Sequence, residues 1–136
     1  MIQRTLAIIK PNAVRNNWIG RIINLIEEDG LRIVNAKMTT MTAAGADCFY
    51  AEHAGKPFLG DLISFMTSGP VMLLVLEGEN AVKRYRDLMG STDPSKAAPG
   101  TIRSLYGESL NHNSVHGSDS VESAEREVYL CFGEWI

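Results

Sequence analysis

The most apolar stretch of the chain is residues 71–76, which read VMLLVL. A short, continuous apolar run bounded by turn residues is typical of a strand buried within a sheet. The turn residues SGP at 68–70 precede this run, so we predict a central strand here. Residues 6–9 (LAII) predict a second buried strand, which Pro11 stops and which leaves Lys10 at its C-terminal end.

Two more strands are expected, one over residues 31–38, where apolar and polar residues roughly alternate, and a short one around Val115. Between strands the apolar spacing becomes helical. Isoleucines recur at i, i+3, i+4 and i+7 from Ile19 to Ile26, and Gly30 stands where a helix C-terminal cap belongs. Further helices are expected from Thr42, a suitable N-terminal cap, to about His53, over residues 58–66, over residues 81–89, and from Val121 onward.

The last predicted helix follows a long connection. Residues 90–107 contain prolines and glycines but no strong period, and a connection of this length inside a compact domain is usually functional. Asp119 can cap the helix, with Glu122 at the reciprocal position of a capping box. The predicted buried face of this helix consists of Val121, Ala124, Val128, Cys131 and Phe132.

The order of elements predicts the fold class. It runs strand, helix, strand, helix pair, strand, helix, long loop, strand, helix, without internal repeats, linkers or low-complexity tracts. This order fits the βαββαβ arrangement of ferredoxin-like α+β folds, in which an antiparallel four-stranded sheet is covered by helices. The length of 136 residues is that of one ordinary domain, spanning residues 1–136.

Composition narrows the class of protein. A hydrophobic fraction of 45% and a charged fraction of 21% are those of a soluble globular protein. No apolar run approaches the roughly 20 residues that span a bilayer, and no signal peptide is evident, so we expect a cytoplasmic protein. The net charge of −3 and the lack of a basic stripe give no reason to expect nucleic acid as a partner. Cys48 and Cys131 show no metal-binding or redox spacing and are expected to be buried free thiols.

The segment most relevant to function is residues 111–120, NHNSVHGSDS, which holds two of the three histidines. It runs directly into the last predicted helix, and loops held beside a rigid element are where catalytic groups concentrate. His116 is the candidate, because imidazole can act as a nucleophile or proton carrier near neutral pH. Gly117 beside it would let the backbone turn sharply and a ligand approach closely. The alternative is that His116 is an ordinary loop residue with a satisfied hydrogen bond.

The common phosphate-binding loops are absent from the sequence. Lys56 is followed by Pro57 and lacks the upstream glycine of a P-loop, and no dinucleotide fingerprint occurs. Any nucleotide must therefore be held in some other way. Because the net charge is −3, a chain that binds nucleotides must gather cations locally. Lys10, Arg86 and Arg103 are candidates because each stands next to a turn signal, although each could instead be a solvated surface charge.

Residues 113–120, NSVHGSDS, resemble the active-site signature of the nucleoside diphosphate kinases, Asn-x-x-His-Gly-Ser-Asp-Ser. This motif is long and specific. The resemblance covers nearly the whole chain, because further blocks similar to the family occur in the family's order at residues 5–14, 49–58, 65–80 and 86–103.

The resemblance implies covalent catalysis. In this family a histidine attacks the γ-phosphate of a nucleoside triphosphate, a phosphohistidine forms, and a second nucleoside diphosphate takes the phosphoryl group. His116 matches the nucleophile, and Glu127 and Ser118 match the positions that support it. Glu127 lies outside the apolar stripe of its predicted helix and can point back toward the loop, although an exposed carboxylate is the alternative.

The same resemblance implies the nucleotide contacts. Lys10, Arg86 and Arg103 match phosphate ligands, and Thr92 matches a hydroxyl donor. Arginine suits this role because its planar fork meets phosphate oxygens bidentately. Asn113 matches a residue that, together with Lys10, contacts the ribose 3′-hydroxyl.

Three further residues match positions around the base and the histidine. Phe58 matches an aromatic residue that stacks on the base, Leu110 an apolar residue on its opposite side, and Tyr50 an aromatic residue next to the histidine. Stacking accepts every base, so purines and pyrimidines should both be substrates. His53 and His112 have no match and are expected to be surface loop residues.

The predicted function is therefore that of a nucleoside diphosphate kinase with a ping-pong mechanism. Mg²⁺ is expected to arrive with the nucleotide phosphates, because no carboxylate cluster resembles a dedicated metal cage. One alternative is a regulatory module that binds nucleotides without catalysis. Another is a histidine-dependent phosphatase, in which water accepts the phosphoryl group.

The chain is also expected to form a homo-oligomer built on a two-fold dimer. An antiparallel sheet in a small chain leaves edge strands, and residues 31–38 are the expected edge. Pairing of this edge with its copy would satisfy the free backbone groups. Relatives form tetramers or hexamers, and the end of the chain at Ile136, before the tails that help many relatives assemble, leaves that step open.

Overall fold

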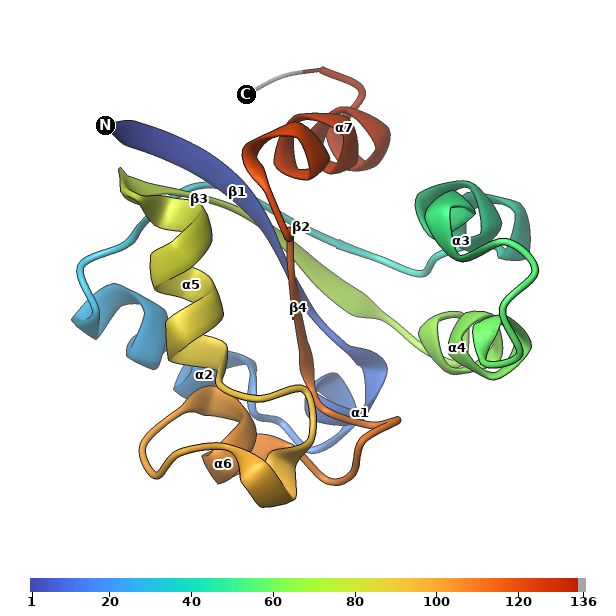
Figure 1. Ribbon diagram of the computed structural model, residues 1–136, viewed down its shortest axis with the longest axis horizontal. Coiled ribbons are helices and arrows are strands. Elements are labelled where there is room, and N and C mark those ends of the chain that lie inside the picture. Colours follow the sequence, from blue (N-terminus) through green and yellow to red (C-terminus); the bar gives the residue numbers. More distant parts are fainter. Residues whose placement is uncertain (135–136) are drawn as a thin grey trace.

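The computed structural model describes residues 1–134, so Trp135 and Ile136, the predicted end of the domain, lie outside the described residues. The centre of the fold is a four-stranded sheet in the order β2-β3-β1-β4, in which every neighbouring pair is antiparallel (Figure 1). This is the ferredoxin-like α+β arrangement expected from the sequence. The strands are β1 (Ile2–Ile9), β2 (Arg32–Thr39), β3 (Val71–Glu79) and β4 (Val115–Gly117).

The two middle strands, β1 and β3, are the most buried. Every residue from Thr5 to Ile9 is buried, and the VMLLVL run lies in β3, so both predicted buried strands are confirmed. β2 forms one edge, as predicted, and β4 forms the other. In the pairing of β1 with β4, Ile8 stands opposite His116. The end of β1, where Lys10 follows, therefore lies beside the start of β4.

The helices occur in the predicted order, with three differences. A short helix at Pro11–Arg15, which was not predicted, follows β1. The cap at Thr42 is confirmed, because its Oγ1 accepts a hydrogen bond from the backbone N–H of Gly45 at 3.0 Å, but the helix ends at Phe49 instead of near His53. The long connection contains a helix of only five residues, α6, which is too short to show an apolar period. None of the helices in the described residues is long and apolar enough to cross a bilayer. The helices are α1 (Pro11–Arg15), α2 (Ile19–Glu28), α3 (Ala43–Phe49), α4 (Leu59–Met66), α5 (Ala81–Met89), α6 (Ile102–Tyr106) and α7 (Val121–Phe132), with 3-10 turns η1 (Ala51–His53) and η2 (Pro94–Lys96).

Two hydrophobic clusters cover the two faces of the sheet. Ala7 and Ile9 of β1 pack with buried residues of α2, α5 and α6, whereas Leu6 and Ile8 pack with α3, α4 and α7. Figure 1 shows the same separation, with α2, α5 and α6 on one side of the sheet and α3, α4 and α7 on the other. Side chains alternate between the faces of a strand. Val115 belongs to the first cluster, so the next residue on β4 points toward the side of α3 and α7.

The start and the buried face of α7 differ from the prediction. The Oγ of Ser120 accepts a hydrogen bond from the backbone N–H of Ser123 at 3.1 Å, so Ser120 is the N-terminal cap and the prediction for Asp119 was wrong. Asp119 lies one residue too early to reach this N–H and turns toward Arg86 instead. On the inner face Ala124, Val128 and also Glu127 are buried, whereas Cys131 and Phe132 are half-buried and Val121 is exposed.

The cysteines are free, as expected, but only one is shielded from solvent. Cys48 is exposed, so its predicted burial was wrong, because it lies on the outer side of the short helix α3. Cys131 is half-buried on α7. Burial and the neighbouring Glu127 carboxylate raise the pKa of the Cys131 thiol to about 12. This thiol therefore stays protonated and packs as an apolar group.

Candidate active site

Two adjoining hollows gather the predicted site residues. The first is a cavity of about 600 Å³ beside β4, and the second is a more apolar hollow of about 880 Å³. Lys10, Leu62, Thr92 and Asn113 line both, so the two hollows form one continuous groove. Ser118 lies behind the groove, against Glu127. The other predicted residues of the first hollow are Tyr50, Arg86, Arg103, His116 and Glu127, and those of the second are Phe58 and Leu110.

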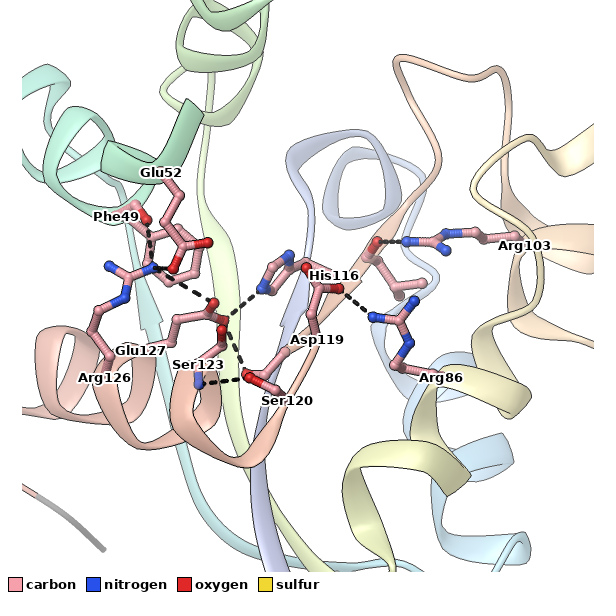
Figure 2. Close-up of polar contacts among 12 residues, drawn as sticks. Phe49, Glu52, Arg86, Arg103, His116, Asp119, Ser120, Ser123, Arg126 and Glu127 are labelled. Atoms are coloured by element: carbon pink, nitrogen blue, oxygen red, sulfur yellow. Dashed lines mark hydrogen bonds and ion pairs between the residues drawn. The ribbon is translucent and has the colours of Figure 1, made fainter. Parts of the chain in front are cut away.

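His116 lies at the centre of the first hollow and is held by a carboxylate. Its Nε2 atom lies 2.8 Å from Oε1 of Glu127, which also accepts a hydrogen bond from Oγ of Ser118 at 2.9 Å. Figure 2 shows the Glu127 side chain pointing from α7 to the imidazole. The rings of Phe49 and Tyr50 meet the imidazole edge to face, with centroids 5.3 and 6.5 Å away. The orientation of the imidazole is therefore fixed by packing and by a part-buried hydrogen bond.

The backbone around His116 differs from the expected loop. His116 lies within β4, and Gly117 does not make a turn there. A Cβ atom at Gly117 would lie 2.6 Å from Cε of Met89 and 2.7 Å from Cδ2 of Tyr85. The glycine is thus required because α5 packs closely on this side of β4. The left-handed residue of the segment is Ser114, with φ at 75°.

Lys10 is a buried cation with an amide partner. Its Nζ donates a hydrogen bond to Oδ1 of Asn113 at 2.9 Å, and Nδ2 of Asn113 donates to the carbonyl of Thr92 at 3.1 Å. Burial, together with the nearby Arg103 guanidinium, lowers the pKa of Lys10 to about 7. A bound anion would favour the charged form of this amine.

The two predicted phosphate-binding arginines have different surroundings. Arg103 is buried, and its guanidinium donates to the carbonyls of Gly90 at 3.0 Å and Val115 at 2.8 Å. Burial lowers the pKa of Arg103 from its usual value; Tyr85 opposes this shift and Arg86 adds to it. Arg86 is half-exposed and pairs with Asp119, which projects toward it from the loop before α7 (Figure 2). Both guanidinium groups line the first hollow.

The second hollow presents exposed apolar side chains. Phe58 is 47% exposed and Leu110 is 55% exposed, so both present apolar surface to solvent. The two residues lie on segments far apart in the sequence and line the same hollow. The ring of His112 stacks on that of Phe65 with centroids 4.3 Å apart, and His112 is exposed, as predicted.

Several residues of the first hollow were missed at the level of sequence. His53 was expected on the surface, but it is half-buried in η1, stacks on Tyr50 and lines the first hollow. Arg126 and Glu52 also line it and pair with each other at 3.3 Å. No sequence signal identifies them, because a charged residue on a helix such as α7 is typical of a solvated face.

The acidic side chains of the groove do not form a metal cage. Within residues 1–134 no group of three or more histidine, cysteine, aspartate or glutamate side chains is arranged to hold a metal ion. The carboxylates of Glu52, Asp119 and Glu127 are each engaged by a basic side chain of the protein. A divalent cation at this site would therefore need other oxygen ligands, such as phosphate oxygens.

The model of the nucleoside diphosphate kinase family matches residues 3–135. The chain belongs to this family. It is 56% identical over 131 residues to the nucleoside diphosphate kinase of Bdellovibrio bacteriovorus, covering 96% of this chain and 93% of that protein. It is 55% identical over 131 residues to nucleoside diphosphate kinase 2 of Protochlamydia amoebophila, covering 96% and 92%.

Solved structures of this family have the same fold. The nucleoside diphosphate kinase of Aquifex aeolicus superposes with a TM-score of 0.95 at 41% identity, covering 97% of this chain and 96% of that chain. The Halobacterium salinarum enzyme, solved in complex with CDP, gives a TM-score of 0.94 at 44% identity, covering 98% and 90%. The ferredoxin-like fold and the predicted nucleoside diphosphate kinase function are confirmed. The chain is thus a phosphotransferase of nucleotide metabolism.

Proposed function

We propose that this kinase works by a ping-pong mechanism in which His116 carries the phosphoryl group. The observation that carries the proposal is the contact between Nε2 of His116 and Oε1 of Glu127 at 2.8 Å. An ionised carboxylate only accepts hydrogen bonds, so Nε2 bears the proton and the lone pair resides on Nδ1. The hydrogen bond that Nε2 donates to Glu127 therefore makes Nδ1 the nucleophilic nitrogen.

The reaction consists of two displacements. In the first, the Nδ1 lone pair attacks the γ-phosphorus of a nucleoside triphosphate. A nitrogen–phosphorus bond forms, the bond to the bridging oxygen breaks, and the diphosphate leaves with that electron pair. The phosphorylated ring is cationic, and Glu127 stabilises it through Nε2. In the second, a β-phosphate oxygen of another diphosphate attacks the phosphorus and Nδ1 leaves as the neutral imidazole.

The cations of the first hollow stabilise the charge that develops on the phosphates. Lys10, Arg86 and Arg103 line the hollow that contains His116, as phosphate ligands should. Thr92 adds a hydroxyl group, and Asn113, already bonded to Lys10, is placed for the ribose 3′-hydroxyl. A bound phosphate would compete with Asp119 for Arg86, because both are anions that pair with its guanidinium group.

We further propose that the nucleotide enters as its Mg²⁺ complex. The carboxylates that line the first hollow are paired with basic side chains, so the phosphate oxygens themselves would hold the ion. When bound, Mg²⁺ neutralises part of the charge on the transferring phosphates. Lys10 and the two arginines orient the same phosphates from the protein side.

The base would lie in the second hollow, between Phe58 and Leu110. Both side chains are exposed there and offer apolar surface to either face of a planar ring. Stacking and apolar contact do not depend on the hydrogen-bonding edge of the base. Nucleotides with any of the common bases are therefore the proposed substrates.

The assembly and the location of the enzyme are also proposals. β2 lies at the edge of the sheet, and pairing of this edge with its copy would form a two-fold dimer, on which tetramers or hexamers could be built. Light scattering tests the assembly, because a mass near the 14.9 kDa of one chain would refute the dimer. A cytoplasmic location stays a prediction that cell fractionation would test.

Labelling with γ-³²P ATP tests the proposed mechanism. Wild-type enzyme should acquire label that acid removes and alkali does not, as expected of phosphohistidine. His116→Ala should acquire none, while its circular dichroism spectrum stays that of the wild type. Equal labelling of the two proteins would refute the assignment of His116. Addition of ADP should return the label as ATP, and release as inorganic phosphate would identify a phosphatase instead.

A further inference from the structure

Arg126 reaches from α7 to the end of α3 and contacts three acceptors with one nitrogen. Its Nη2 lies 3.3 Å from the carbonyl oxygen of Phe49, 3.3 Å from Oε1 of Glu52 and 3.9 Å from Oε2 of Glu127. Figure 2 shows the guanidinium between these groups, on the side of Glu127 away from His116. Arg126 is thus an indirect neighbour of the imidazole, with one carboxylate between them.

The two oxygens of Glu127 serve different partners. Oε1 accepts from Nε2 of His116 and from Oγ of Ser118, whereas Oε2 faces Arg126. The Glu127 side chain is only 7% exposed, and a buried carboxylate is costly without a compensating charge. A neutral imidazole supplies none. In the described part of the chain, Arg126 is the one arginine or lysine that pairs with this carboxylate.

This arrangement bears on two opposing effects of Glu127 on His116 in the proposed mechanism. Glu127 must orient His116, but its negative charge also favours the protonated imidazolium, which has no lone pair on Nδ1 and cannot attack. A positive charge on the far side of the carboxylate offsets that effect without disturbing the hydrogen bond to Nε2. Glu52, an exposed carboxylate, also pairs with Arg126 and weakens this offset. The other charged groups of the hollow around His116 are the same in the Arg126 variants and the wild type: Lys10, Arg86, Arg103 and Asp119. The guanidinium is suited to this because it stays charged at any pH at which the enzyme is folded.

We propose that Arg126 is a positioning residue that keeps His116 unprotonated at neutral pH by offsetting the charge of Glu127. This inference rests on the proposed phosphohistidine mechanism. It assigns Arg126 no contact with the reacting phosphate, because its Nη2 already faces Phe49, Glu52 and Glu127. The competing explanation is that Arg126, which lines the first hollow, is a direct phosphate ligand.

The pH dependence of phosphoenzyme formation distinguishes the two. In single-turnover experiments with saturating Mg·ATP, the rate should fall toward acidic pH as His116 becomes protonated. We expect Arg126→Met to move the half-maximal pH of this limb upward by roughly half a unit to one unit, since it removes a charge near a buried carboxylate. Arg126→Lys keeps the charge and should restore the wild-type position of the limb.

Arg84→Met is the matched control. Arg84 has the same side-chain exposure as Arg126, 35%, also pairs with an acidic residue, Asp29, and lies outside the groove, so the change in net charge is identical. Its pH profile should match that of the wild type. An equal shift in Arg84→Met and Arg126→Met would mean a general effect of net charge and would overturn the proposal.

Two other results would also overturn it. One is an Arg126→Met variant whose half-maximal pH equals that of the wild type. The other is a raised KM for ATP with no change in the half-maximal pH, which is expected of a direct phosphate ligand. If Arg126→Met does not fold, Arg126→Gln replaces it in the experiment, because the glutamine amide can still donate a hydrogen bond to Phe49. The same shift of the acidic limb is expected. Absence of phosphoenzyme in the wild type at every pH would refute the proposed mechanism itself, so the two failures are distinguishable.

Discussion

The guanidinium of Arg103 donates a hydrogen bond to the carbonyl oxygen of Val115, with 2.8 Å between Nη2 and O. Val115 immediately precedes His116 on β4, so a residue expected to bind phosphate also holds the backbone of the nucleophile. A second bond, from Nη1 to the carbonyl of Gly90 at 3.0 Å, holds the end of α5. Arg103 therefore has a structural role that Arg86, which pairs only with an exposed aspartate, does not share.

Substitution of these two arginines should have different effects on stability. Arg103→Met leaves two carbonyls without their donor and should lower the free energy of unfolding by about 2 to 4 kcal/mol. Arg86→Met removes a half-exposed ion pair and should change it by less than about 0.5 kcal/mol. Both should lose activity. Urea unfolding measures the difference, and equal stabilities of the two variants would contradict the structural role of Arg103.

Gly117 should tolerate no side chain. Gly117→Ala places a Cβ atom 2.6 Å from Met89 and 2.7 Å from Tyr85, so α5 or β4 must shift, at a cost of about 1 to 3 kcal/mol. Gly20→Ala is the control, because a Cβ atom there meets nothing within 4 Å and the helix α2 should gain about 0.5 to 1 kcal/mol. Thermal unfolding of the two variants tests this. Similar melting temperatures would show that β4 is not packed as described.

Lys10 should make stability depend on pH. The pKa of Lys10 is about 7 in the folded protein against 10.5 for an ordinary lysine, so the unfolded chain binds more protons between these values. Wild-type stability therefore rises with pH across this window. Lys10→Met removes the buried charge and should stabilise the protein by on the order of 1 to 2 kcal/mol at about pH 6, and by less at about pH 9.

The control for this experiment is Lys83→Met, which removes an exposed lysine paired with Asp87. The stability difference between this variant and the wild type should not change with pH over the same range. A difference between Lys10→Met and the wild type that is constant from about pH 6 to about pH 9 would show that Lys10 does not titrate there.

The enzyme should discriminate weakly between bases. Phe58 and Leu110 offer apolar surface, and apolar contacts discriminate by only a few kcal/mol, so kcat/KM for ATP, GTP, CTP and UTP should agree within about two orders of magnitude. Steady-state kinetics with one common diphosphate acceptor measures this. Rejection of all but one base by more than roughly 10⁴-fold would reveal directional hydrogen bonds in the second hollow.

Much of the fold could be predicted because its signals are local. The apolar runs in β1 and β3, the isoleucine spacing in α2 and the cap at Thr42 each depend on a few adjacent residues. The errors have local causes too. Asp119 and Ser120 are both good caps, and only the backbone path shows that Ser120 reaches the N–H of Ser123.

The site could be predicted only as a set of residues. The family resemblance identified His116 and Arg103, but the bonds of Arg103 to two backbone carbonyls depend on how α6 packs against β4 and α5. The sequence likewise could not predict why residue 117 must be glycine, because the side chains that exclude a Cβ atom there come from α5. Arg126 had no signal at all, since two of its three partners lie on α3 and η1, more than seventy residues away.

The most direct test of the central claim is transfer from isolated phosphoenzyme. Enzyme is phosphorylated with ATP, freed of nucleotide by gel filtration, and mixed with CDP alone. The mechanism predicts one CTP for each phosphohistidine, and none from His116→Ala treated in the same way. Release of inorganic phosphate without CTP, or formation of CTP only while ATP is still present, would contradict a phosphoryl group carried by His116.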